Sequence, residues 1–266
     1  MIFGATLGYF LTKFNNTKKN SAASISCQIL LAFFCLLFFL SIIIGQSRGA
    51  FIFAILLGLL ILFLIPKTKK IKIIGLITLI GILSLTYFLK VGIVEKQINY
   101  QKDNNVLSYR DRVWNVSIEA SRFSPLLGIG MSNWYFITLD HLKNSVESRH
   151  GKFNPDDYGF PGHSHNLYLT ALVERGLIGL LITLIFMGAW IGSLIKTYRQ
   201  ALKSNISSNL WVGSFSAWVA TFGIGAVNTT FHHEHAILAC LFFGLYLSYA
   251  RIFFKLKIKN TKTIGK

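Results

Sequence analysis

The stretch GLIGLLITLIFMGAWIGSLI, residues 176–195, contains no charged side chain and decides the fold class. A helix of about 20 such residues crosses about 30 Å of hydrocarbon, because each residue adds about 1.5 Å. Similar apolar stretches occupy residues 28–45, 49–65, 71–89 and 236–254, and hydrophobic residues make up 53% of the 266. The sequence therefore predicts an all-α, polytopic integral membrane protein.

A sixth predicted span, residues 210–231, is less apolar and rich in Gly, Ser and Thr, which suits a helix packed against other helices. Residues 1–11 are apolar but too short to cross, and they lack the features of a signal peptide. We expect them to be the remnant of a span in an amino-terminally shortened chain. The predicted organisation is a remnant at 1–11, three transmembrane helices in 25–89, a large loop with short amphipathic helices at 90–164, three transmembrane helices in 165–254 and a basic tail at 255–266.

The formal net charge of +17 is distributed in a way that indicates membrane topology. The basic residues concentrate in alternate connections, at 13–19, 67–72, 196–203 and 251–266, and none of these segments contains Asp or Glu. About six spans place all of them on one side, which the positive-inside rule makes cytoplasmic. Nucleic-acid binding is not indicated, because the positive charges are spread over separate loops rather than along one stripe.

The opposite side carries the loop at 90–164, which holds eight of the ten acidic residues, and the short turn GQSRGAF at 45–51. Arg48 in this turn runs against the local charge bias, since short outer loops are usually poor in arginine. A guanidinium suits bidentate binding of a phosphate. The alternative is an interfacial arginine that reaches the lipid headgroups.

The loop contains SYRDRVWNVSIEASRFSPLLGIGMSNW, residues 108–134, which has helical spacing over 109–123. Arg110, Trp114 and Ile118 recur every four residues. Pro125 ends the predicted helix, and the glycines at 128 and 130 indicate a close turn. The residues alone are equally compatible with a short amphipathic helix at the membrane surface.

The histidines at 163 and 165 precede the span at 176–195, so we expect them on a helix end that overlooks the outer surface. Glu174 and Arg175 then fall at the headgroup boundary. Histidine can accept or donate a proton near neutral pH, although a lone surface histidine usually has no role. The run HHEH at 232–235 is interpreted as a solvated turn rather than a metal site, because sequence neighbours rarely converge on one ion.

These motifs together resemble the bacterial O-antigen ligase and polymerase family of polytopic membrane glycosyltransferases. His165-Asn166, nine residues, then Gly176-Leu177-Ile178-Gly179 is similar to the family motif His-Asn-x9-Gly-x-x-Gly. SRGA at 47–50 resembles the family's outer-turn arginine motif. R-x-x-x-W at 110–114 with PLLGIG at 125–130 resembles the start of its large periplasmic loop.

The resemblance implies transfer of a glycan (O-antigen) from undecaprenyl pyrophosphate to an acceptor hydroxyl, at the periplasmic face of the bacterial inner membrane, in lipopolysaccharide biosynthesis. It implies no nucleotide sugar, no metal and no cofactor. Ligation to lipid A–core is the favoured activity. It is narrowly ahead of O-antigen polymerase activity or protein O-oligosaccharyltransferase activity. Alternatives of another class are a lipid-linked glycan transporter or an inactive assembly protein. A transporter would show charges near the bilayer midplane, whereas here they gather at the outer rim.

The resemblance also assigns roles to residues of this sequence. His165 is the expected catalytic base, and Arg48 and Arg110, with their neighbour Arg112, are expected to bind the pyrophosphate. The two motif glycines are expected to let a neighbouring helix or the lipid tail come close, and the charges at 174 and 175 to form an interfacial pair. The predicted supporting residues are His163, Asn166, Gly176, Gly179, Glu174 and Arg175.

Overall fold

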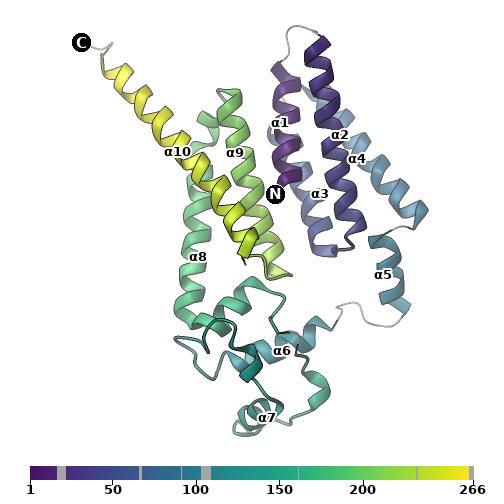
Figure 1. Ribbon diagram of the computed structural model, residues 1–266, viewed down its shortest axis with the longest axis vertical. Helices are drawn as coiled ribbons and strands as arrows, with labels where there is room; N and C mark the ends of the chain where they lie inside the picture. The colour runs from purple at the N-terminus through teal and green to yellow at the C-terminus, as the bar shows by residue number, and fades with distance from the viewer. Residues whose placement is uncertain are drawn as a thin grey trace. The chain divides into compact units, whose positions relative to one another are not determined.

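The computed structural model describes residues 1–16, 22–65, 68–90, 92–102, 109–160, 162–231 and 233–263. Within these ranges the chain forms helices joined by turns and no strand, which confirms the all-α class (Figure 1). Among the described helices, four are long and apolar enough to cross a membrane, and the 17-residue helix Arg48–Leu64 is a shorter apolar one. The four are Ile25–Ile44, Lys69–Leu89, Leu167–Ala201 and Glu234–Ile252. A multi-pass membrane protein is therefore confirmed.

The chain divides into two compact units. The first contains Met1–Glu95, Trp190–Ala220 and Glu234–Lys266, and the second contains Lys96–Ala189 and Thr221–His233. Helix α8 (Leu167–Ala201) contributes residues to both units.

The first unit is a set of packed helices: α1 (Ile2–Asn16), α2 (Ala22–Ile44), α3 (Arg48–Leu64), α4 (Lys69–Leu89), α9 (Asn205–Trp218) and most of α10 (His233–Thr263). The apolar residues 1–11 belong to α1, which contacts α9, α2 and α3 (Figure 1). Small residues permit this packing, since a Cβ at Gly8 would lie 2.3 Å from Cγ1 of Val212. The amino-terminal segment is thus an integral part of this unit.

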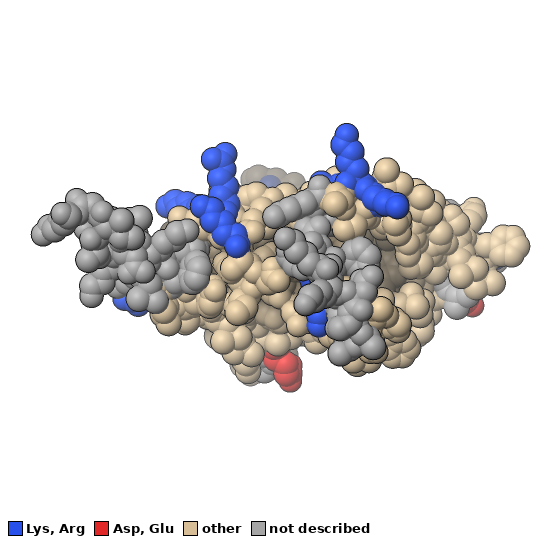
Figure 2. Space-filling model, turned by 90° about the horizontal axis from the view of Figure 1, so that it is seen from above, with Lys and Arg blue, Asp and Glu red and all other residues tan. Residues whose placement is uncertain are grey.

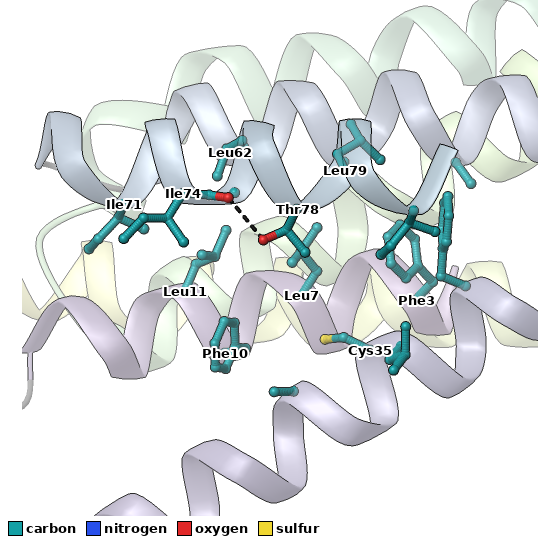
Figure 3. A pocket seen from close by; sticks show the side chains of 17 residues that line it. Phe3, Leu7, Phe10, Leu11, Cys35, Leu62, Ile71, Ile74, Thr78 and Leu79 are labelled. Carbon is teal, nitrogen blue, oxygen red and sulfur yellow. Dashed lines mark hydrogen bonds between the residues drawn. The ribbon is translucent and has the colours of Figure 1, made fainter. Parts of the chain in front are cut away.

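Helices α1 to α4 line a partly open pocket of about 490 Å³ within the first unit (Figure 3). Its lining is almost entirely apolar, with Phe3 and Leu7 from α1, Leu62 from α3 and Leu79 from α4. Thr78 also lines it, but the hydroxyl of this residue donates to the Ile74 carbonyl inside α4 at 2.9 Å. The polar atom is therefore satisfied within its own helix.

Basic side chains are exposed at the connections of the first unit that the structure describes. Lys69 and Lys70 begin α4, and Lys196 and Arg199 lie in the last turns of α8. Seen from above, Lys and Arg side chains stand out from a surface that is otherwise mostly uncharged (Figure 2). The positive-inside rule predicts that the connections carrying these Lys and Arg side chains lie on the cytoplasmic side.

The second unit is built around the amino-terminal part of α8. It contains most of α5 (Ile93–Lys102), α6 (Arg110–Ala120), the 3₁₀ turn Asn133–Phe136, α7 (Leu139–Glu147) and the 3₁₀ turn Pro155–Asp157. One hydrophobic core joins α6, the 3₁₀ turn Asn133–Phe136, α7 and α8: Val116, Ala120, Trp134, Ile137, Leu142 and Val173. Helix α6 and the amino-terminal part of α8 are therefore held around a common core.

The sixth predicted span, residues 210–231, is not a regular helix throughout. Helix α9 ends at Trp218 and continues as a π-helical turn, Val219–Gly223, and a 3₁₀ turn, Ile224–Ala226. This stretch is not among the four described helices that meet the length and hydropathy of a span. The π and 3₁₀ turns change the pitch of the backbone.

Candidate functional site

The predicted site lies mainly in the second unit, where Asn166 caps helix α8. The side-chain Oδ1 of Asn166 accepts hydrogen bonds from the backbone N–H of Tyr168 at 2.9 Å and of Leu169 at 3.0 Å. These two donors would otherwise lack partners at the first turn of the helix. The Nδ2 group donates to the Ala226 carbonyl at 2.9 Å. The amide of Asn166 is thus used to begin α8 and to tie it to another segment, not to orient an imidazole.

His165 directly precedes this cap and has a left-handed backbone, with φ of 49°. This region is unfavourable for most residues that carry a Cβ, and such conformations often occur at functional sites. Nε2 of His163 lies 3.2 Å from Nδ1 of His165, and the two rings meet edge to face with centroids 4.2 Å apart. Both rings are partly exposed. The arrangement allows one imidazole to hydrogen-bond the other.

Residues 221–231 pack against the first turns of α8, and the sequence did not predict this contact. The hydroxyl of Tyr168 donates to the Phe222 carbonyl at 2.8 Å, and the hydroxyls of Thr170 and Thr229 lie 3.2 Å apart. A Cβ at Gly225 would lie 3.0 Å from Cδ2 of Leu167. The signal in the sequence was the change from a glycine-rich run to the polar run Asn228–Thr230 inside an otherwise apolar segment.

Helix α8 is interrupted at Gly176, the first residue of the predicted span 176–195, so the helix end that follows His165 and the span are two helical segments. Gly176 has φ of 65° and ψ of −166°, a combination open essentially to glycine alone. The freed backbone groups pair with the loop that follows α6: the Leu177 N–H donates to the Pro125 carbonyl at 2.8 Å, and the Ile178 N–H donates to the Leu126 carbonyl at 3.3 Å.

The same loop also bonds to the residues before the break. The Ile129 N–H donates to the Val173 carbonyl at 2.8 Å, and the Gly130 N–H donates to the Glu174 carbonyl at 3.0 Å. A Cβ at Gly176 would lie 2.2 Å from the Leu126 oxygen, and one at Gly128 would lie 2.3 Å from the Glu174 carbonyl carbon. The close turn predicted at residues 128 and 130 is present, and Gly176 accommodates this backbone rather than a neighbouring helix or a lipid tail.

Glu174 is buried, with 8% of the residue exposed, and does not form the predicted interfacial pair with Arg175. Its Oε1 accepts hydrogen bonds from Nε1 of Trp134 at 2.9 Å and from the Ser132 N–H at 3.3 Å. The carboxylate therefore fixes residues 132–134 to α8. This correction depends on a partner 40 residues away in the chain, which the local sequence does not reveal.

Gly179, the second glycine of the motif, is explained by the same break. A Cβ there would lie 2.1 Å from Cβ of Arg175. Residues four apart are not this close in a regular helix, so the close approach results from the turn at Gly176. Arg175 thus lies over Gly179, and both motif glycines accommodate the interrupted helix.

Arg110 and Arg112 lie in the first turn of α6, where Arg110 is partly exposed and Arg112 is exposed. The guanidinium of Arg112 lies over the ring of Tyr109, with Cζ 4.8 Å from the centroid. The Gly159 N–H donates to the Arg112 carbonyl at 3.3 Å. This bond attaches the start of α6 to the chain segment that leads, four residues later, to His163.

Arg48 belongs to the first unit, where it is the first residue of α3 and partly exposed. The Ser47 hydroxyl caps the helix by accepting from the Ala50 N–H at 3.4 Å. A helix N-terminus carries a partial positive charge, which adds to that of the guanidinium and favours an anion. The predicted tight turn between α2 and α3 is present.

No group of three or more His, Cys, Asp or Glu side chains within the described ranges could hold a metal ion. In the HHEH run, His232 lies outside the described residues, and α10 begins at His233.

Comparison with known proteins places these motifs in context. A family model described as O-antigen ligase matches residues 33–184. The chain is 30% identical over 136 residues to the exopolysaccharide production protein ExoQ of Rhizobium meliloti (strain 1021), an alignment that covers 51% of this chain and 30% of that protein. It is 24% identical over 157 residues to a Rickettsia felis protein provisionally named a polysaccharide ligase, covering 56% of this chain and 35% of that protein. The chain spans about a third of the length of these curated relatives.

Proposed function

Because the chain belongs to the O-antigen ligase family, we propose that it transfers a glycan from undecaprenyl pyrophosphate to an acceptor hydroxyl, with lipid A–core as the favoured acceptor. The reaction takes place at the periplasmic face of the bacterial inner membrane and contributes to lipopolysaccharide biosynthesis. The basic connections of the first unit face the cytoplasm in this orientation, in agreement with the positive-inside rule.

The proposed reaction is a displacement at the anomeric carbon of the donor sugar. The acceptor oxygen forms a bond to that carbon, and the bond between the carbon and the pyrophosphate oxygen breaks. The electron pair leaves with undecaprenyl pyrophosphate, and the hydroxyl proton passes to the imidazole of His165. A pyrophosphate is already a good leaving group, so the protein mainly has to stabilise its charge and to orient the acceptor.

The observation that carries the proposal is the construction of the start of α8. Asn166 fixes the first helical turn, and His165 is held next to it in a left-handed conformation with His163 at 3.2 Å. General bases work when a side chain that titrates near the working pH is held within hydrogen-bonding distance of the reacting hydroxyl. In this scheme His163 keeps the imidazole of His165 oriented.

The proposed cations for the pyrophosphate are Arg48, Arg110 and Arg112. Guanidinium groups bind phosphate oxygens in a bidentate manner and keep their charge at all relevant pH values. Arg110 and Arg112 begin the helix that shares a core with α8, which supports their assignment to the same chemistry as His165. No metal or cofactor takes part in this scheme.

A second candidate is extension of an exopolysaccharide repeat unit by the same chemistry. It is favoured by the match to a relative named for exopolysaccharide production. The donor would be unchanged, and the acceptor would be the end of a second lipid-linked glycan.

The test is complementation of a strain that lacks its own O-antigen ligase, read as the lipopolysaccharide ladder on a gel. We expect the unaltered chain to restore the ladder and the His165→Asn variant to fail at equal membrane abundance. Asparagine tolerates the left-handed backbone, so this variant removes the titratable ring without adding strain. His141→Ala, at an exposed histidine of α7, is the matched control and should restore the ladder.

A ladder restored by His165→Asn would refute the proposed base. Restoration only in a polymerase-deficient strain would favour the second candidate.

A further inference from the structure

The loop between α6 and α7 has a composition unlike the rest of the outer segment. Residues 123–139 (FSPLLGIGMSNWYFITL) contain no Asp, Glu, Lys, Arg or His, although the segment 90–164 holds eight of the ten acidic residues. Several large apolar side chains of this stretch are exposed, with Leu126 at 61%, Leu127 at 71% and Met131 at 65%. Exposed apolar side chains that cluster along one segment indicate an interaction surface.

The depth of this loop follows from its hydrogen bonds to α8. Residues 177–195 carry no charge, and at about 1.5 Å per residue they extend about 28 Å, close to the thickness of the hydrocarbon layer. Lys196 marks the opposite boundary, so the hydrocarbon begins near Leu177. The backbone of Leu177 and Ile178 donates to the carbonyls of Pro125 and Leu126. The loop therefore lies at the depth where α8 enters the bilayer.

The exposed side chains of the loop are also continuous with the lipid-facing surface of α8. Leu177 is 45% exposed and Ile178 is 49% exposed on that helix, and Leu126 is bonded directly to this turn. The aromatic pair Tyr135 and Phe136, with centroids 4.1 Å apart, is exposed further along the same stretch. Aromatic rings of this kind are enriched where a protein meets the membrane interface.

We propose that the loop at residues 125–131 is inserted into the outer-leaflet boundary of the bilayer, with Leu126, Leu127 and Met131 in contact with lipid acyl chains. The loop thereby forms a second membrane attachment of the outer unit, beside the entry of α8. Part of its backbone is already paired in this position, because Pro125 and Leu126 accept hydrogen bonds from α8 while Ile129 and Gly130 donate to it. This inference depends on the membrane assignment and not on glycan transfer.

The test uses site-directed spin labels in the full chain, reconstituted in nanodiscs of defined phospholipid without any lipid-linked glycan. The three free cysteines, Cys27, Cys35 and Cys240, are replaced by alanine, and single cysteines are introduced as Leu127→Cys or Lys143→Cys. Lys143 is exposed on α7 and is the water-facing control. Leu177→Cys is the lipid-facing reference.

We expect the label at position 127 to collide with oxygen several-fold more often, relative to a water-soluble nickel chelate, than the label at position 143. Its ratio should approach that at position 177. Equal ratios at 127 and 143 would overturn the proposal. A label at 127 that is immobilised and shielded from both reagents would also overturn it, because a protein would then cover the loop.

A second measurement tests the same proposal without the cysteine-free variant, in case that variant does not fold. Benzoylphenylalanine placed at position 127 of the otherwise unaltered chain should crosslink to phospholipid on irradiation, and the same group at position 143 should not. Lipid adducts at neither position would overturn the proposal independently.

Discussion

The most direct consequence of the structure is that a side chain at position 176 is costly, although alanine is usually favoured over glycine within a helix. A Cβ at this position would lie 2.2 Å from the Leu126 oxygen and 2.5 Å from the Leu127 nitrogen. Both are backbone atoms, so the loop itself has to move. The backbone angles add strain of about 1–3 kcal/mol for any residue with a side chain.

The loop cannot move without losing hydrogen bonds to α8. The donors at Leu177 and Ile178 pair with the loop, and each such bond contributes about 1 kcal/mol. Strain and lost bonds together predict that Gly176→Ala destabilises the pairing of loop and helix by about 3–5 kcal/mol. The free energy of local opening should fall by this amount, which corresponds to at least about 100-fold faster amide exchange.

Hydrogen exchange measured by mass spectrometry in nanodiscs can test this prediction. Peptides that contain the Ile129 and Leu177 amides should lose protection in Gly176→Ala. The matched control is Gly188→Ala in the same helix, where a Cβ would meet nothing within 4 Å and alanine improves helix propensity by up to about 1 kcal/mol. If Gly176→Ala and Gly188→Ala exchange alike, the break at Gly176 does not have the role assigned to it.

Three further predictions concern single contacts in the second unit. Glu174→Ala should lower the thermal unfolding midpoint, because it leaves the Trp134 N–H without its partner at a cost of about 1–3 kcal/mol. Glu174→Gln keeps an acceptor oxygen and should lower the midpoint less. Equal shifts of the midpoint in the two variants would contradict this prediction. Asn166→Asp should retain the helix cap and lose only the hydrogen bond to Ala226. Asn166→Ala should lose both contacts and destabilise the folded chain by about 1–2 kcal/mol. Circular dichroism recorded on heating would measure the difference. Arg149→Ala should change the midpoint little, because the pair of this residue with Glu119 is partly exposed and worth less than about 1 kcal/mol.

The features that the sequence predicted correctly depend on local patterns. Uncharged stretches identified the long apolar helices, helical spacing identified α6, and Pro125 with the following glycines identified a close turn. Each of these patterns acts over a few residues, so composition and spacing are sufficient to recognise it.

The features that were missed depend on contacts between distant residues. The residues on both sides of Gly176 favour a continuous helix, and the docking of residues 125–130 makes an interruption favourable. Glu174 looked like an interfacial charge because Trp134, its partner, is 40 residues away. The packing of residues 221–231 on α8 follows from a π-helical turn, which has no simple sequence pattern.

These contacts give the spacing of the His-Asn-x9-Gly-x-x-Gly motif a physical meaning. Asn166 fixes one end of a short helical segment, and the pairing at Gly176 fixes the other end near the start of the hydrocarbon. The distance between them is about 15 Å along the helix axis, at about 1.5 Å per residue. In the proposed function, a lipid-linked donor would present its pyrophosphate at a set height above the hydrocarbon, and a base at His165 would have to stand at a matching height. On this proposal the number of residues between the two motif ends sets that height, and the loop paired with α8 around Gly176 holds the segment in place.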